Sequence, residues 1–312
     1  MNTTPSRSTD SITVPAPAKV NLYLEVVGKR PDGYHELRTV MQTVDLLDEL
    51  RVESTPDGTI SLECDAPGMP PQKENLVYRA AMALQERYDV EQGARIRLEK
   101  RIPAGGGLGG GSSDCAAALK GLNLLWNLKV AKEDLHETAS QLGSDIPFFL
   151  TGGTALCTGR GEQVEPVFST HRFHYVLVTP GFPVSTADVY AHVTKGLTSP
   201  EGKLKKVLGG VRTGEVNALA DGLHNDLQEP AYRVSRKLAD IRCKLEGLRW
   251  AAQGKRVLLC GSGSSFLVLH ERSDEARRCA EAISNGLSME CQAVQTWQGL
   301  RPHGRPAMME DG

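Results

Sequence analysis

The feature that most restricts how this chain can fold is a run of six glycines in the seven positions 105–111, interrupted only by Leu108. Glycine loses the most backbone entropy on ordering and has no side chain to pack, so the run predicts a loop. Residues 94–101 before it alternate apolar and polar side chains, the period of a half-buried strand. After it, we expect Ser112 or Ser113 to cap a helix whose inner face is formed by Ala116, Leu119, Leu122 and Leu125.

A strand, a bare loop and a helix start together predict a site for an anion. Helix N-termini attract negative charge, and glycine removes the side chains that would keep a phosphate from the backbone N–H groups. We therefore predict a loop that binds polyphosphate; a flexible surface loop is the alternative. The GxGxxG match adds little, since so many glycines produce it almost automatically. A Walker P-loop is excluded because no Gly-Lys-Ser/Thr ends the run.

Composition limits the classes of protein and partner. The 312 residues predict about two domains, and 36 basic against 38 acidic residues argue against nucleic acid as the main partner. The seven scattered cysteines contain no Cys-x-x-Cys pair and predict reduced thiols in a cytoplasmic protein without a zinc site. No apolar run approaches the roughly 20 residues that span a bilayer, and residues 1–10 read as a disordered leader. The oligomeric state is not indicated.

The pattern of elements predicts an α+β protein of two domains. One domain is expected over residues 11–165 and a second, with longer helices and an antiparallel sheet, over 166–300, followed by a disordered tail at 301–312. A strand is predicted over 18–28, with Asn21, Tyr23 and Glu25 on its polar face. A hairpin is expected from 50–53 and 59–64 around Pro-Asp-Gly, a helix over 75–88 capped by Asn75, and single helices over 132–142 and 232–245.

Phosphoryl transfer needs more than a phosphate loop: a cation for the moving charge, a group that orients or deprotonates the acceptor, and usually magnesium. Asp145 and Lys19 are the best candidates for the base and its cationic partner. The alternatives are that Asp145 only caps a helix and that Lys19 is a solvated strand residue.

Five segments, in this order along the chain, resemble the GHMP kinases, the family of galacto-, homoserine, mevalonate and phosphomevalonate kinases. They are PAKVNL at 17–22, PDGYHEL at 31–37, the glycine loop at 103–113, GSDIPF at 143–148 and GSG at 261–263. The resemblance covers residues 14–300 and implies a two-domain fold with the active site in the cleft between the domains.

The resemblance also implies an activity: ATP-dependent phosphorylation of the 2-hydroxyl of a cytidine diphosphate sugar alcohol, a methylerythritol, in the non-mevalonate route to isoprenoids. Asp145 would be the base and Lys19 its partner. The ATP phosphates would be wrapped by the loop residues Pro103, Ala104, Gly105, Gly106, Gly107, Leu108, Gly109, Gly110, Gly111, Ser112 and Ser113. The adenosine side would be formed by Asn75, Leu76, Val77 and Lys100.

The substrate would contact Asn21, Tyr34, His35, Thr186, Tyr190, Gly261 and Gly263. Tyr34 would stack on cytosine, His35 would hydrogen-bond it and Tyr190 would lie below the base. Alone, Tyr34 is also consistent with a surface aromatic and His35 with a turn histidine. Mg²⁺ is expected with ATP. Its ligands are unknown, with Ser113 as a candidate.

Three other readings remain. One is a GHMP kinase for a different small alcohol, such as homoserine or mevalonate. Another is a non-catalytic nucleotide- or RNA-binding protein, against which the near-neutral charge and the presence of both Lys19 and Asp145 argue. A dinucleotide oxidoreductase is the weakest, because the glycine loop does not follow the first strand of its domain.

Overall fold

The computed structural model describes residues 11–66, 68–193, 202–248 and 257–299. It is a mixed α+β fold, as the sequence predicts, and it contains two sheets. The leader and tail expected at residues 1–10 and 301–312 lie outside the described residues. No helix in the described ranges has the length and apolar character needed to span a membrane. The domain limits expected near residue 166 stay a prediction.

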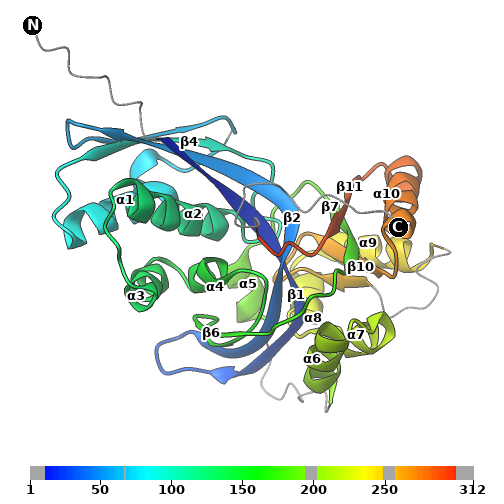
Figure 1. Ribbon diagram of the computed structural model, residues 1–312. Helices are drawn as coiled ribbons and strands as arrows, with labels where there is room; N and C mark the ends of the chain where they lie inside the picture. Colours follow the sequence, from blue (N-terminus) through cyan, green and yellow to red (C-terminus); the bar gives the residue numbers. More distant parts are fainter. Residues whose placement is uncertain (1–10, 67, 194–201, 249–256, 300–312) are drawn as a thin grey trace, which may run out of the picture.

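The larger sheet is centred on two long antiparallel strands, β1 (Ser11–Lys29) and β2 (His35–Thr55), which cross the molecule in Figure 1. Its order is β3-β4-β2-β1-β8. In addition, β5 pairs with β2, and β6 pairs with β5. The other strands are β3 (Ile60–Cys64), β4 (Gly93–Glu99), β5 (Thr154–Gly159), β6 (Gln163–Pro166) and β8 (His224–Asn225). The smaller sheet, β11-β7-β10-β9, is antiparallel and consists of β7 (His174–Thr179), β9 (Val257–Leu259), β10 (Phe266–His270) and β11 (Glu290–Gln295).

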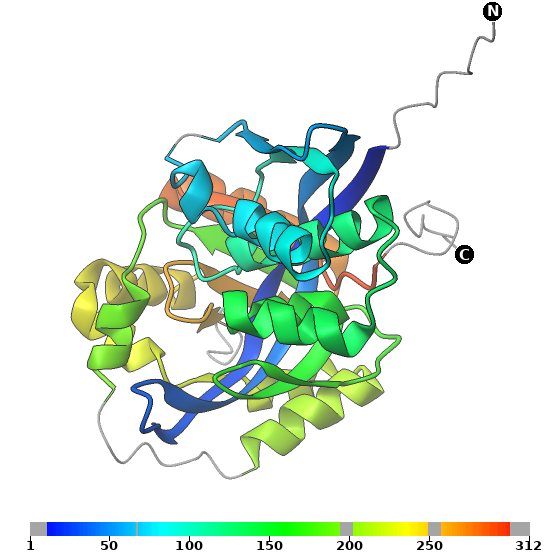
Figure 2. The same cartoon turned by 90° about the vertical axis from the view of Figure 1, so that its left-hand side faces the viewer.

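Helices from the first half of the chain pack on one face of the larger sheet. They are α1 (Leu76–Arg87), α2 (Gly110–Leu125), α3 (Lys132–Leu142) and α4 (Ile146–Thr151), with the short 3-10 turn η1 (Gln72–Glu74) before α1. Figure 2 views the green helices of this group in front of the blue strands β1 and β2. The remaining helices are α5 (Thr186–Ala191), α6 (Lys203–Thr213), α7 (Val216–Gly222), α8 (Gln228–Val234), α9 (Arg236–Glu246) and α10 (Ser273–Leu287).

Strand β1 takes part in all three apolar cores of the described chain. Its first part packs under α1 and α2 through Ala16, its middle packs against the smaller sheet through Val20 and Leu22, and its end packs with α8 and α9 through Leu24 and Val26. Because both faces of the strand are covered, a polar side chain on it is buried and needs a partner. The burial of β1 therefore requires its polar residues Lys19 and Asn21 to have partners inside the protein.

Four expectations about the elements are wrong. Strands β2 and β3 do not form a hairpin, because β4 lies between them, antiparallel to β2 and parallel to β3. Tyr23 does not share a polar face with Asn21: a bulge between the two shifts the register, and Tyr23 is buried in the same core as Leu22. The single helix expected over 232–245 is two helices, α8 and α9, separated at Ser235. The fourth wrong expectation is that Ser112 or Ser113 caps α2.

Helix α2 begins at Gly110, and its N-cap is Gly109 with φ +72° and no side-chain cap. Ser112 and Ser113 therefore lie inside the first turn rather than before it. A Cβ on Gly109 would lie 2.8 Å from the Phe149 ring and 3.0 Å from Lys19 Cγ, so a capping side chain does not fit there. Elsewhere the local signals hold: the Asn75 side chain accepts a hydrogen bond from Val77 N at the start of α1, and α3 ends at Gly143.

Candidate active site

The glycine loop is held between strand β1 and the turn that joins β9 to β10. Lys19 N donates to Leu108 O at 2.9 Å, and Ser265 N donates to Gly106 O at 3.1 Å. Gly107 has φ +77°, and a Cβ there would lie 2.1 Å from Cys260 O. The loop thus needs glycine at 107 to approach the neighbouring backbone.

The structure brings Lys19 and Asp145 together beside this loop. Lys19 Nζ lies 3.8 Å from Asp145 Oδ2 and donates to Asn21 Oδ1 at 2.6 Å. The Asn21 amide in turn donates to Thr39 Oγ1 at 2.9 Å. Since Lys19 and Asn21 are buried, this chain of hydrogen bonds from β1 to β2 fixes the direction of the ammonium.

Asp145 occupies the N-cap position of α4, but its side chain makes no capping hydrogen bond. Its carboxylate is about one third exposed and faces the Lys19 ammonium instead. An ionised carboxylate next to a buried cation, with one side open, is able to accept a proton from an incoming hydroxyl. The geometry therefore permits the role of base, whereas helix capping does not explain the direction of the side chain.

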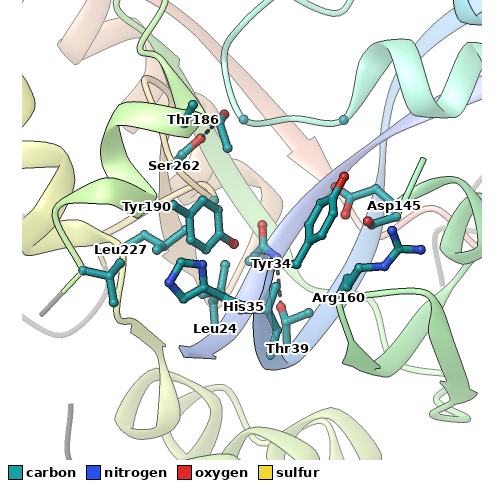
Figure 3. A pocket seen from close by; sticks show the side chains of 18 of the residues that line it. Leu24, Tyr34, His35, Thr39, Asp145, Arg160, Thr186, Tyr190, Leu227 and Ser262 are labelled. Carbon is teal, nitrogen blue, oxygen red and sulfur yellow. Dashed lines mark hydrogen bonds between the residues drawn. The ribbon is translucent and has the colours of Figure 1, made fainter. Parts of the chain in front are cut away.

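Both residues of this pair line a pocket of about 810 Å³, which Figure 3 shows from close by. Such a volume lies within the range of small-molecule sites. Residues predicted for the site that line it are Lys19, Asn21, Tyr34, His35, Gly107, Gly109, Asp145, Thr186, Tyr190 and Gly261. Thr186 Oγ1 lies 2.8 Å from Ser262 Oγ, a contact that links α5 to the turn after β9.

Aromatic rings gather in the same pocket. The His35 and Tyr190 rings stack with centroids 5.0 Å apart, and in Figure 3 Tyr34 lies between this pair and Arg160. Burial, with a smaller contribution from the charge of Lys29, lowers the pKa of His35. A neutral imidazole offers one N–H donor and one nitrogen acceptor, which suits the edge of a nucleobase.

The other predicted residues do not line the pocket. They are Pro103, Ala104, Gly105, Gly106, Leu108, Gly110, Gly111, Ser112 and Ser113 of the loop region, Asn75, Leu76 and Val77 at the start of α1, Lys100, and Gly263. The Lys100 ammonium is buried between two carboxylates. It contacts Asp48 and donates to Asp114 Oδ2 at 2.7 Å.

Burial and the nearby second carboxylate of Asp48 raise the pKa of Asp114 to about 7, against the lowering effect of Lys100. Two carboxylates share one ammonium here. The cluster joins β2, the end of β4 and the start of α2, and so connects the two sides of the glycine loop.

Several pocket residues had no motif to mark them. Thr39 lies opposite Leu24 in the β1–β2 register, so only the strand pairing brings it near Asn21. Leu24 and Leu227 also line the pocket, as does Ser262, which lies within the GSG segment at 261–263. Arg160 lies in the glycine-flanked turn after β5, which the sequence indicates as a turn that could approach phosphates or as a plain hairpin turn.

Comparison with known proteins identifies the family. A sequence model described as the GHMP kinases N terminal domain matches residues 75–153. The chain is 44% identical over 269 residues to 4-diphosphocytidyl-2-C-methyl-D-erythritol kinase of Pelotomaculum thermopropionicum, covering 86% of this chain and 92% of that protein. It is 37% identical to the enzyme of that name from Shouchella clausii, over 94% of this chain and 95% of that protein.

Solved structures of kinases also match the chain. A crystal structure of 4-(cytidine 5'-diphospho)-2C-methyl-D-erythritol kinase matches with a TM-score of 0.77 and 38% identity, over 92% of this chain and all of that one. Homoserine kinase from Cytophaga hutchinsonii matches with a TM-score of 0.73 but only 18% identity, over 95% of this chain and 97% of that one, and so shares the fold. Together with the glycine loop and the pocket beside it, these similarities show that the chain belongs to the GHMP kinase family of ATP-dependent small-molecule kinases.

Proposed function

We propose that this protein transfers the γ-phosphoryl group of ATP to the 2-hydroxyl of 4-diphosphocytidyl-2-C-methyl-D-erythritol, in the non-mevalonate route to isoprenoid precursors. One observation carries the proposal: a single pocket holds the Lys19–Asp145 pair beside the glycine loop, together with the stacked His35 and Tyr190 rings. The relatives that are 37–44% identical over most of their length bear the name of this activity.

In the proposed reaction, Asp145 accepts the proton of the substrate 2-hydroxyl, whose oxygen attacks the γ-phosphorus as the bond to ADP breaks. Lys19 lies against the carboxylate and offsets the negative charge on the transferred group. Asn21 holds the ammonium in place through its 2.6 Å hydrogen bond. Positioning and electrostatics are the main contributions a protein makes to phosphoryl transfer.

ATP would lie with its phosphates along the glycine loop and the start of α2, where backbone N–H groups and the helix dipole favour negative charge. We assign its adenosine to the side formed by Asn75, Leu76 and Val77, with Lys100. A magnesium ion arriving with ATP would neutralise phosphate charge and needs only one or two protein ligands. The Ser113 hydroxyl, buried at the start of α2 without a hydrogen-bond partner, fits that need.

The cytidine diphosphate part would lie toward the aromatic side chains. Tyr34 stacks on cytosine, Tyr190 closes the opposite side, and neutral His35 hydrogen-bonds the base edge. Thr186, Gly261 and Gly263 are assigned to the substrate side as well. We also propose that the pocket is the cleft between two domains, residues 11–165 and 166–300. A cytoplasmic location stays a prediction of the cysteine pattern.

The test is an ATP-consumption assay with 4-diphosphocytidyl-2-C-methyl-D-erythritol, homoserine and mevalonate offered separately, and with the phosphorylated product identified by NMR. We expect turnover with the cytidyl substrate alone and a new phosphate on the 2-oxygen. Asp145→Asn should lower kcat by about 10²–10⁴-fold, whereas Asp134→Asn, which alters an exposed carboxylate on α3, should leave it unchanged. Faster turnover of homoserine or mevalonate would refute the proposal.

A further inference from the structure

Arg160 is a pocket residue to which the proposed reaction gives no task. It lies in the turn between β5 and β6, and its guanidinium carbon is 5.0 Å from the centroid of the Tyr34 ring. That distance is within the range in which an arginine is attracted to the face of an aromatic ring. Figure 3 shows the two side chains next to each other at the side of the pocket away from Tyr190.

The turn itself fixes where the arginine points. The Glu162 carboxylate accepts a hydrogen bond from Arg160 N at 2.6 Å and lies 3.8 Å from Arg160 Nε. Arg160 Nη2 reaches Ser140 O, at the end of α3, at 3.5 Å. The guanidinium therefore lies near two oxygen atoms from different segments, at 3.8 and 3.5 Å, before any ligand enters.

Tyr34, in contrast, has little else to hold its ring. The residue is 54% exposed, and its backbone N–H donates to Asp32 Oδ1 within the turn between β1 and β2. A ring this exposed can occupy several rotamers, and fixing one of them costs binding free energy. The guanidinium covers one face of the ring, and the other face is left for a planar ligand.

We propose that Arg160 is a positioning residue that stacks on one face of the Tyr34 ring and so fixes its rotamer. The opposite face, toward Tyr190, is then oriented to stack on the nucleobase. This inference rests on the proposed function, because it assumes a cytidine ligand. The competing role for a cation at this place is direct contact with the diphosphate of the substrate. The two roles differ in what they require of the ligand: stacking requires only the base, whereas ion pairing requires the phosphates.

The test compares the binding of cytidine and of cytidine diphosphate by isothermal titration calorimetry, in the full-length wild type and in Arg160→Met. Loss of the stacking contact should weaken both probes by the same factor, about two- to fivefold. The KM for the cytidyl substrate should rise by that factor, while kcat and the KM for ATP stay unchanged. In a Tyr34→Ala background, Arg160→Met should have no further effect, since the ring it positions is gone.

Arg242→Met is the matched control. Arg242 lies 5.8 Å over the Tyr232 ring on neighbouring helices, and its side chain is as exposed as that of Arg160, 27% in each case. The Arg242→Met substitution removes an arginine–aromatic contact of the same kind outside the pocket. It should leave the affinities for cytidine and cytidine diphosphate unchanged.

Three results would overturn the inference: weakening of cytidine diphosphate alone, an Arg160→Met effect that persists in the Tyr34→Ala background, or unchanged affinities in Arg160→Met. If the wild type binds neither cytidine nor cytidine diphosphate, the proposed function is refuted, and with it the role of Arg160, which assumes a cytidine ligand.

Discussion

Replacing Gly107 by alanine tests whether the glycine loop depends on its contact with the turn after β9. A Cβ on Gly107 would lie 2.1 Å from Cys260 O and 3.0 Å from Gly263 O, both backbone atoms. The residue also has φ +77°, which costs a non-glycine residue about 1–2 kcal/mol. Relieving the overlap adds about 1–3 kcal/mol, as for other overpacked sites. We therefore expect Gly107→Ala to lower the free energy of unfolding by about 2–5 kcal/mol.

The same loop contains the control. Gly111 lies in the first turn of α2, and a Cβ there would meet no atom within 4 Å. Gly111→Ala should thus keep or raise stability, by at most about 1 kcal/mol from helix propensity, while its methyl group crowds the proposed phosphate site and raises the KM for ATP. Urea denaturation followed by circular dichroism gives the stabilities, and steady-state kinetics give the KM values. If Gly107→Ala unfolds within about 0.5 kcal/mol of the wild type, the argument from close approach is refuted.

Three further outcomes are expected. Asp145→Ala should lower kcat by about 10²–10⁴-fold with the ATP affinity nearly unchanged; turnover near the wild-type rate would remove Asp145 as the base. Because the pKa of Asp114 is raised to about 7 in the folded protein, its contribution to stability is present at low pH and is lost as the pH rises through about 7. Asp114→Asn should therefore gain stability relative to wild type as the pH rises from about 4 to 7, by at most about 4 kcal/mol, and a difference in thermal unfolding that does not change with pH would contradict this. Lys100→Met should destabilise by about 3–5 kcal/mol, since it leaves buried Asp48 without its cation; denaturation at pH 7 measures this, and a loss below 1 kcal/mol would be too small for a buried pair.

Local sequence signals predicted those parts of the fold that depend on neighbouring residues. The Asn75 cap and the end of α3 at Gly143 follow from cap chemistry, which acts over a few residues. Two of the failed expectations, the hairpin and the face on which Tyr23 lies, depend on strand pairing, and the cap of α2 depends on the packing of Phe149 and Lys19 against Gly109; the break at Ser235 is the one local failure. The edge of β2 was expected to pair with β3, but β4 pairs with it instead and lies between the two.

The sequence by itself determined that a bare loop and the two side chains Lys19 and Asp145 exist, because glycine freedom and charged groups are properties of single residues. Tertiary structure alone decided that Lys19 Nζ lies 3.8 Å from Asp145 Oδ2, that Lys100 is buried between Asp48 and Asp114, and that Arg160 faces Tyr34. Each of these contacts joins segments far apart in the chain. Their geometry is set by how the sheets and helices pack, and no local pattern encodes that.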